Sequence, residues 1–352
     1  MSLNVLNATE VLAQLDTFDT VIDARSESEF ALDHLPGAVN WPTLNDEERK
    51  AVGTLYVQVN QFEAKKRGAA IAARNIAAHI ERDVIDKPRE WKPLAYCWRG
   101  GKRSGSLTLI LDQIGFRVTL VEGGYKAFRV AMLQDITLRA QKLDWRVVCG
   151  TTGSGKTRLL HALRKAGAQV LDLEGLANHR SSVLGAIPGL PQPSQKRFDT
   201  LIWDALRQFD PAQPVFVESE SKKVGNVAIP AALVERMRAS PCLDLTLPTH
   251  ERVALLLEDY DFFVQDSVHF CERLDVLAEF RGKAVVQAWK DQIHSGNFEP
   301  VVQELLTQHY DPVYRQSMLR NFTQYPQARA IAPDDHSMNA MGRLARQLLD
   351  RL

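Results

Sequence analysis

Two short stretches of the sequence carry residue types that could do chemistry. Residues 97–104 are CWRGGKRS, in which a cysteine follows an apolar run and precedes two glycines, three basic residues and a serine. Residues 150–157 are GTTGSGKT, which satisfies the pattern GxxxxGK[ST]. Both stretches are candidates for binding anions, and the first also offers a nucleophile.

The cysteine stretch is predicted to be a strand-to-helix turn, because Cys97 ends the apolar run PLAYC (93–97) and Ser104 opens a helical pattern over 104–115. Backbone N–H groups and a helix N-terminus then surround the sulfur and favour the nucleophilic thiolate. The same groups can hold a tetrahedral anion, and the spacing Cys-x5-Arg is that of phosphatase loops. A buried, inert thiol is the alternative. The predicted anion ligands are Arg99, Gly100, Gly101, Lys102, Arg103 and Ser104.

The glycine-rich stretch lies between an apolar strand (146–150) and an amphipathic helix (155–168), as a phosphate-binding P-loop requires. Glycines let successive N–H groups point into one concavity, and a lysine adds a full positive charge. The pattern predicts a diphosphate site and does not specify whether a nucleotide carries the diphosphate. The residues expected to hold it are Gly150, Gly153, Ser154, Gly155, Lys156 and Thr157.

Nucleotide hydrolysis would also require Mg²⁺, held by Thr157 and by an acid at the end of a neighbouring strand. Asp172 and Glu218 are the candidate acids near the P-loop, and each could equally be a helix cap or an ion-pair partner. No metal is firmly implied. Four scattered cysteines without a CxxC pair argue against a disulfide framework and a zinc site.

The bulk properties describe an ordinary globular chain of about two domains. Of its 352 residues, 45% are hydrophobic and 24% charged, and 43 basic residues balance 43 acidic ones. A polyanionic partner must therefore be held by a local basic surface. We expect a cytoplasmic protein, since the N-terminus has no basic leader pattern and no apolar run approaches the roughly 20 residues of a membrane helix.

Short apolar strands alternate with helical stretches in two series, which indicates the α/β class with parallel sheets. Gly115 is placed to end the helix over 104–115 in the left-handed conformation. A polar helical stretch over 126–145 separates the two series, and the final hundred residues look mainly helical. We predict two domains, 1–135 and 136–352. The strands of the first series are expected at 20–25, 38–42, 93–97 and 117–124, and those of the second at 146–150, 169–175, 214–221 and 241–248.

The segment DARSESEFALDHLPGAVNWP (23–42), followed by YCWRGGKRS, resembles the rhodanese domain. Rhodanese-like domains carry sulfur or selenium on the loop cysteine, and relatives with a loop one residue longer act on phosphate esters. This loop has the longer length. The resemblance therefore implies a substrate that combines a chalcogen with phosphate.

With EGGYKAFR (122–129), LDLEGLANHRSSVLG (171–185) and VESESKKVG (217–225), the whole chain resembles the tRNA 2-selenouridine synthase family. The resemblance implies a rhodanese-like parallel-sheet domain followed by a P-loop NTPase-like α/β domain with a helical C-terminal part. It also implies a transferase: wobble 2-thiouridine is geranylated by geranyl diphosphate, and selenium from selenophosphate then displaces the geranylthio group.

In that scheme Cys97 carries selenium as a perselenide, its loop binds selenophosphate, and the P-loop binds the geranyl donor without hydrolysing a nucleotide. The implied partners are tRNAs for Lys, Glu and Gln and an enzyme that supplies selenophosphate, with no membrane, and we expect a monomer. Basic residues near the strand ends of the second domain are candidate tRNA contacts: His179, Arg180, Lys196, Arg197, Lys222 and Lys223.

Two other classes of function stay open at this point. One is an ATP-dependent kinase or ATPase whose rhodanese-like domain is a phosphatase or a redox sensor. The other is a catalytically silent rhodanese module that serves as a binding platform, against which the intact Cys97 loop already weighs.

Overall fold

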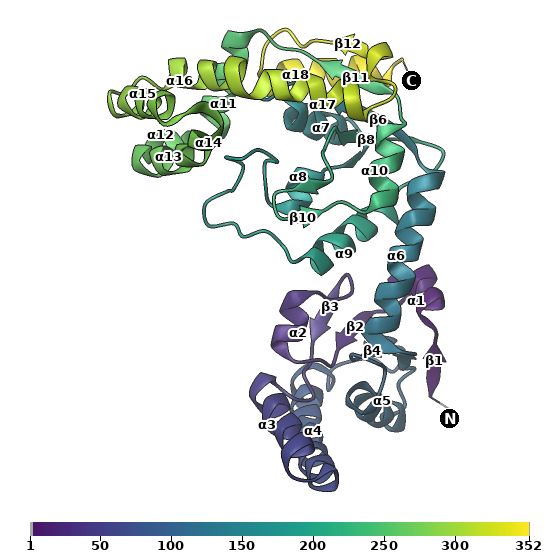
Figure 1. Cartoon of the computed structure of the whole chain (residues 1–352). Helices are drawn as coiled ribbons and strands as arrows, with labels where there is room; N and C mark the ends of the chain where they lie inside the picture. The colour runs from purple at the N-terminus through teal and green to yellow at the C-terminus, as the bar shows by residue number, and fades with distance from the viewer. Residues whose placement is uncertain (1–2, 352) are drawn as a thin grey trace. The chain divides into compact units, whose positions relative to one another are not determined.

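The computed structural model describes residues 3–351, and the chain forms two compact units, each built on its own parallel sheet (Figure 1). The first unit runs to Ile136 and also includes Ser194–Asp204. The second comprises Thr137–Pro193 and the chain from Ala205 onward. The chain therefore passes between the units three times, first within helix α6 (Gly124–Lys142).

The sheet of the first unit has the strand order β1-β5-β4-β2-β3, with every pair parallel. Its central strands are buried almost throughout, as expected where helices cover both faces of a parallel sheet. The strands are β1 (Asn4–Leu6), β2 (Thr20–Asp23), β3 (Ala38–Asn40), β4 (Pro93–Tyr96) and β5 (Thr119–Val121). The helices before α6 are α1 (Ala8–Gln14), α2 (Glu27–Leu32), α3 (Asp46–Gln58), α4 (Gln61–Asp83) and α5 (Lys102–Ile114).

Local sequence explains where several of these helices begin and end. Helix α2 starts with a capping box between Ser26 and Glu29, and α3 starts with one between Asn45 and Glu48. Helix α5 ends at Gly115, whose φ of 110° lies in the left-handed region, so the predicted helix end is confirmed.

The sheet of the second unit has the order β12-β11-β6-β8-β7, again wholly parallel. Its strands are β6 (Asp144–Cys149), β7 (Gln169–Leu171), β8 (Pro214–Glu218), β11 (Cys242–Leu245) and β12 (Arg329–Ile331), and a small hairpin consists of β9 (Lys223–Val224) and β10 (Val227–Ala228). Because β6 is central, the loop that follows it emerges between the carboxyl ends of β8 and β11. Open parallel sheets commonly bind ligands at such an edge.

Helices make up most of the rest of the second unit. They are α7 (Lys156–Lys165), α8 (Leu173–Ala177), α10 (Ala231–Arg238), α11 (Thr249–Asp259), α12 (Asp261–Gln265), α13 (Ser267–Leu274), α14 (Ala278–Arg281), α15 (Lys283–His294), α16 (Phe298–Glu304), α17 (Asp311–Asn321) and α18 (Met338–Leu349). Helices α12 to α16 share a core of their own, separate from the one around the sheet. Within residues 3–351, no helix is both long and apolar enough to cross a bilayer.

The predicted fold class is confirmed, with two parallel sheets and a mainly helical C-terminal part. The main difference concerns helix α9 (Gln195–Leu206), most of which belongs to the first unit although the sequence places it deep in the second series. Helix α5 also begins at Lys102, two residues before its predicted start. The sequence patterns did not predict α3, β1 or β12.

Candidate functional site

The Cys97 loop turns directly from strand β4 into helix α5. Cys97 is the first residue after the strand and is 3% exposed. The Ser104 hydroxyl donates to its sulfur at 3.1 Å. The sulfur therefore lies at the junction of strand and helix, where a hydroxyl of the first turn of α5 contacts it.

The close approach of two glycine-containing segments keeps this loop compact. A Cβ at Gly100 would lie 2.6 Å from the Val121 carbonyl oxygen, and one at Gly124 would lie 2.2 Å from the Cys97 carbonyl oxygen. In the first turn of α6, the Tyr125 N–H donates to the Cys97 carbonyl oxygen at 2.8 Å. The segment EGGYKAFR (122–129) therefore packs against the cysteine loop and stabilises its conformation.

The basic residues of the loop do not all face an anion. Arg103 forms an ion pair with Glu29 at 2.6 Å, and both side chains are largely buried. Burial alone would raise the pKa of Glu29, but the bond and charge of Arg103 hold that pKa below its usual value. Arg99 and Lys102 are exposed, and no ion pair involving either is found among residues 3–351. They are the loop cations left to bind an anion.

A buried ion pair anchors the strand next to the loop. Arg25, 1% exposed, binds the Asp23 carboxylate through Nε and Nη2 at 2.6–3.0 Å. The Tyr96 hydroxyl donates to the same carboxylate at 2.8 Å, and the Arg25 guanidinium lies 4.0 Å from the ring centroid of Tyr125. This is the Asp-x-Arg of the resemblance, and its role is to fix the end of β2 beside β4.

Helix α9 completes the first unit near this loop. The Thr200 hydroxyl donates to Asp33 at 2.9 Å, and the Tyr125 hydroxyl donates to the same oxygen at 2.6 Å. Burial raises the pKa of Asp33. The Lys196 ammonium lies 5.5 Å from the ring centroid of Trp98, the residue that follows Cys97. Helix α9 therefore adds a cation to the surroundings of the cysteine loop.

The P-loop follows β6 and opens helix α7. Gly150, Gly153 and Gly155 have φ angles of 149°, 75° and 86°, values that L side chains rarely adopt. The Lys156 ammonium donates to the Gly150 carbonyl at 2.7 Å and lies 5.0 Å from the ring centroid of Tyr314. The lysine is thus folded over the concavity that an anion would fill.

Two side chains from the helical region, buried Arg252 and half-buried Tyr314, brace this loop. Arg252 donates to the Thr152 carbonyl at 2.7 and 3.0 Å and is paired with Asp311 at 2.6 Å. The Tyr314 hydroxyl accepts the Gly150 N–H at 3.1 Å and lies 2.5 Å from the Ser219 hydroxyl oxygen. The loop is therefore rigid before any ligand arrives, which lowers the cost of binding.

The acids near the P-loop are arranged differently from the prediction. The Thr157 hydroxyl donates to Glu174 at 3.1 Å, and the Glu174 N–H donates to Glu218 at 2.8 Å. Asp172 caps α8 through the Gly175 N–H at 2.7 Å and bonds His161 at 3.0 Å. The acid next to the P-loop hydroxyl is thus Glu174 rather than Asp172 or Glu218.

Asp172 and Glu218 are buried and Glu174 is half-buried; desolvation raises the pKa of Glu174 and, far more strongly, that of Glu218. It also raises the pKa of Glu220, which accepts a hydrogen bond from Ser181, to about 8. Within residues 3–351 no group of three or more His, Cys, Asp or Glu side chains could by itself hold a metal ion. Thr157 and Glu174 could still contribute two ligands to a Mg²⁺ whose other ligands are substrate oxygens and water.

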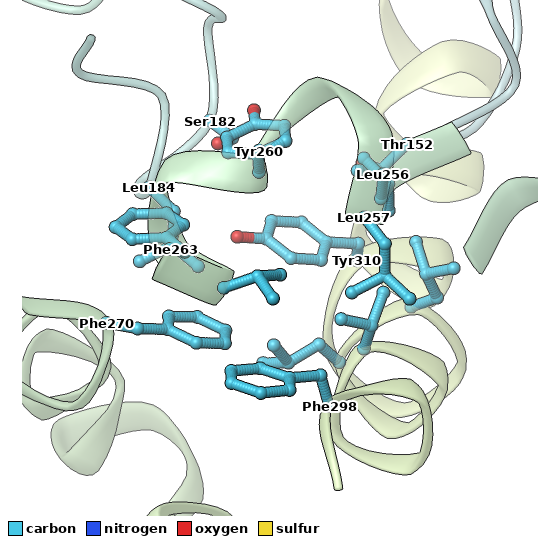
Figure 2. A pocket seen from close by; sticks show the side chains of 14 residues that line it. Thr152, Ser182, Leu184, Leu256, Leu257, Tyr260, Phe263, Phe270, Phe298 and Tyr310 are labelled. Carbon is cyan, nitrogen blue, oxygen red and sulfur yellow. The ribbon is translucent and has the colours of Figure 1, made fainter. Parts of the chain in front are cut away.

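An apolar pocket adjoins the P-loop (Figure 2). Its cavity volume is about 60 Å³. Figure 2 shows the aromatic rings gathered around the hollow, with Thr152 of the P-loop at one side. The lining is Thr152, Ser182, Leu184, Leu256, Leu257, Tyr260, Phe263, Val264, Phe270, Phe298, Val302, Leu305, Leu306 and Tyr310.

P-loop and pocket are in direct contact, because a Cβ at Gly153 would lie 3.0 Å from the Leu256 side chain. Burial raises the pKa of both Tyr260 and Tyr310, so these rings stay neutral. This part of the second unit therefore offers an amphiphilic site, with the glycine-rich loop and Lys156 at one end and an apolar hollow at the other.

The six basic residues predicted to contact tRNA are divided between the two units. Lys196 and Arg197 belong to α9 and so to the first unit, where Arg197 donates to the His34 carbonyl at 3.2 Å. Arg180 donates to the Asp259 carbonyl and lies 4.4 Å from the ring centroid of Tyr260, beside the pocket. The other three, His179, Lys222 and Lys223, belong to the second unit. The prediction that all six lie near the strand ends of the second domain is therefore wrong for the two residues of α9.

The two units define the class of the protein: a rhodanese-like cysteine-loop domain joined to a P-loop α/β domain. Comparison with protein families supports both parts. A rhodanese-like domain model matches residues 7–131, and a model described as the tRNA 2-selenouridine synthase AAA domain matches residues 143–283.

The chain belongs to the tRNA 2-selenouridine synthase family. It is 32% identical to a protein of that name from Sulfurovum sp. over 329 residues, 86% of this chain and 89% of that one. A namesake from Marinobacter nauticus is 32% identical over 84% of this chain and 87% of its own length. One from Nitrosomonas europaea is 37% identical over 68% of this chain, but the match spans only 63% of that relative.

Sequence reasoning missed several residues of both sites. Glu174 could have been predicted as a P-loop acid, because it closely follows a strand in the LDLEG segment. The prediction instead named Asp172 and Glu218, the acids at the strand ends. No local sequence pattern marks Arg252 or Tyr314, because each lies in a helix more than 90 residues from the P-loop that it contacts. The apolar pocket was also unpredictable, since its walls come from five separate chain segments or more.

Proposed function

We propose that this protein makes 2-selenouridine at the wobble position of tRNA in two transfers, first of a geranyl group and then of selenium. The family relationship supports tRNA as the substrate, since the relatives are named for that product. The single observation that carries the first transfer is the amphiphilic site, in which an apolar pocket opens beside a diphosphate-binding loop.

The chemistry of an isoprenoid diphosphate matches that site. Its diphosphate would lie on the P-loop N–H groups against Lys156, and its hydrocarbon chain would lie among Phe263, Phe270 and Phe298. The thiocarbonyl sulfur attacks the allylic carbon, and the carbon–oxygen bond breaks to release diphosphate. The cation and N–H groups of the loop stabilise the charge that develops there.

Geranylation gives the second transfer its leaving group. A thiocarbonyl sulfur departs poorly, whereas the alkylated sulfur leaves as a geranylthiol. Hydrolysis of the P–Se bond of selenophosphate, with Arg99 and Lys102 holding the phosphate, would release hydrogenselenide, which displaces a thiol from a disulfide of Cys97 and leaves the perselenide. Reduction of the perselenide by a thiol, which forms a disulfide with Cys97, would free the selenide that attacks the geranylated base.

Further parts of the proposal rest on family resemblance. The substrates would be tRNAs for Lys, Glu and Gln, an upstream enzyme would supply selenophosphate, and a monomer would work in the cytoplasm. Mg²⁺, if used, would be held by Thr157 and Glu174 and would neutralise diphosphate charge.

The deciding experiment is a stepwise reconstitution with the whole chain. Purified protein is incubated with tRNA bearing 2-thiouridine and geranyl diphosphate, then with selenophosphate and a thiol, and the nucleosides are identified by mass spectrometry after each step. We expect S-geranyl-2-thiouridine first and 2-selenouridine second. Steady ATP hydrolysis that ignores tRNA, together with no geranylated nucleoside, would favour the kinase or ATPase alternative.

A further inference from the structure

The hairpin of helices α3 and α4 is a sparsely buried part of the first unit. None of the 13 residues of α3 is buried, and among the 23 residues of α4 only Ala64, Ile76 and His79 are. Figure 1 shows the two helices extending side by side away from the strands of their sheet. A helix of 23 residues is about 35 Å long, so the tip lies well away from the base.

The base of the hairpin is held firmly by polar contacts. Arg74 of α4 pairs with Glu48 of α3 at 2.6 Å, and Asn75 donates to the same glutamate at 2.7 Å. His79 lies 3.1 Å from the Pro42 carbonyl oxygen through Nε2. The helices approach closely at Gly68, where a Cβ would lie 3.2 Å from Val52. The hairpin is thus rigid without needing its outer side chains.

Those outer side chains form an unusual surface at the tip, residues 56–67. Exposed fractions are 45% for Tyr56, 83% for Val57, 69% for Val59 and 66% for Phe62. Large apolar side chains that stay exposed to water do not contribute to the free energy of folding. Their concentration at one tip therefore indicates a surface that binds a partner.

Charge identifies that partner. The tip carries Lys65, Lys66 and Arg67, the only run of three consecutive basic residues in a chain of no net charge. Lys66 pairs with Glu63 at 2.6 Å, with its ammonium 5.1 Å from the ring centroid of Phe62. Lys65 and Arg67 are exposed and have no ion-pair partner among residues 3–351.

We propose that the tip of the α3–α4 hairpin, residues 56–67, is a tRNA-binding surface. Exposed aromatic rings beside free cations are the combination that holds unpaired nucleotides, since rings stack on bases while cations bind phosphates. A second copy of the chain fits poorly, because a two-fold contact at this tip would bring its basic run against itself. The proposal rests on the proposed function for the choice of tRNA, and it adds a contact outside both reaction sites.

Binding of 2-thiouridine tRNA to the whole chain, measured by fluorescence anisotropy over a range of salt concentrations, tests the proposal. The double variant Lys65→Glu with Arg67→Glu should lose two phosphate contacts. The slope of log K against log salt should then fall by about 1.4 for an unpaired strand, which makes binding about 25-fold weaker at 0.1 M salt. The matched control, Lys87→Glu with Arg89→Glu, changes the charge equally at two exposed sites beyond α4 and should bind as the unaltered protein does.

Phe62→Ala provides an independent check. The ring is exposed, so folding should be unaffected, while loss of one stacked base weakens binding by about 5-fold to 150-fold at every salt concentration. If the unaltered chain binds and modifies tRNA but the tip variants bind with equal affinity and slope, the hairpin proposal is wrong and the proposed function stands. If instead they turn a dimer into a monomer in sedimentation while tRNA affinity is unchanged, the tip is a self-association surface. If the unaltered chain binds no tRNA, both proposals fail.

Discussion

Replacing Lys156 with alanine tests the assignment of the P-loop most directly. The Lys156 ammonium is the one full positive charge within the loop motif, and it bonds the Gly150 carbonyl at 2.7 Å over the anion concavity. Removing one preorganised group of this kind lowers kcat by about 10²–10³-fold, equivalent to about 2.7–4 kcal/mol of transition-state stabilisation. We therefore expect geranyl transfer to fall by that factor at saturating geranyl diphosphate.

The assay is a single-turnover transfer to 2-thiouridine tRNA, with the geranylated nucleoside measured by mass spectrometry. Lys165→Ala is the matched control, since it removes an exposed lysine from the last turn of the same helix α7. That variant should keep the full rate. Both variants should unfold at nearly the temperature of the unaltered protein, because neither lysine lies in the core.

A Lys156→Ala rate within about threefold of the unaltered protein would refute the reasoning. A developing diphosphate could not then depend on this cation, and the leaving group would have to lie elsewhere. A loss of binding without a loss of rate at saturation would mean that the lysine stabilises the bound substrate and the transition state equally, which would also contradict the proposed role.

Three further predictions concern the first unit. Cys97→Ala should accumulate geranylated tRNA and form no 2-selenouridine in the two-step assay; unchanged selenation would exclude the carrier role. Thr200→Val removes a donor from buried Asp33 and should cost about 1–3 kcal/mol in urea unfolding; a change below about 0.5 kcal/mol would argue that α9 does not stabilise this unit. Because the folded-state pKa of Glu29 lies below its usual value of 4.5, its pairing with Arg103 contributes stability above that pH and loses it as the pH falls. Unfolding of Glu29→Gln between pH 3 and 7 should therefore depend less on pH, and an unaltered dependence would contradict the pairing.

The two loops could be predicted from the sequence because each is a single stretch of chain between a strand and a helix. Gly150 to Thr157 and Cys97 to Ser104 carry their own backbone requirements, so local patterns suffice. Helix α3 escaped prediction for a physical reason, since it buries none of its side chains and so has no apolar period to detect. Arg252 and Tyr314 brace the P-loop through tertiary contacts between distant parts of the chain. Such contacts produce no local sequence pattern, so these residues could not be predicted.

The placement of α9 bears on how such a chain can be taken apart or recombined. A fragment ending at Ile136 keeps all five strands of its sheet but loses the helix whose Thr200 bonds the buried Asp33. The complementary fragment would present α9 with its usual neighbours missing. The second half of the chain thus supplies a helix to the first unit, and an exchange of either half between related proteins would break the Thr200–Asp33 contact unless the new partner restored it.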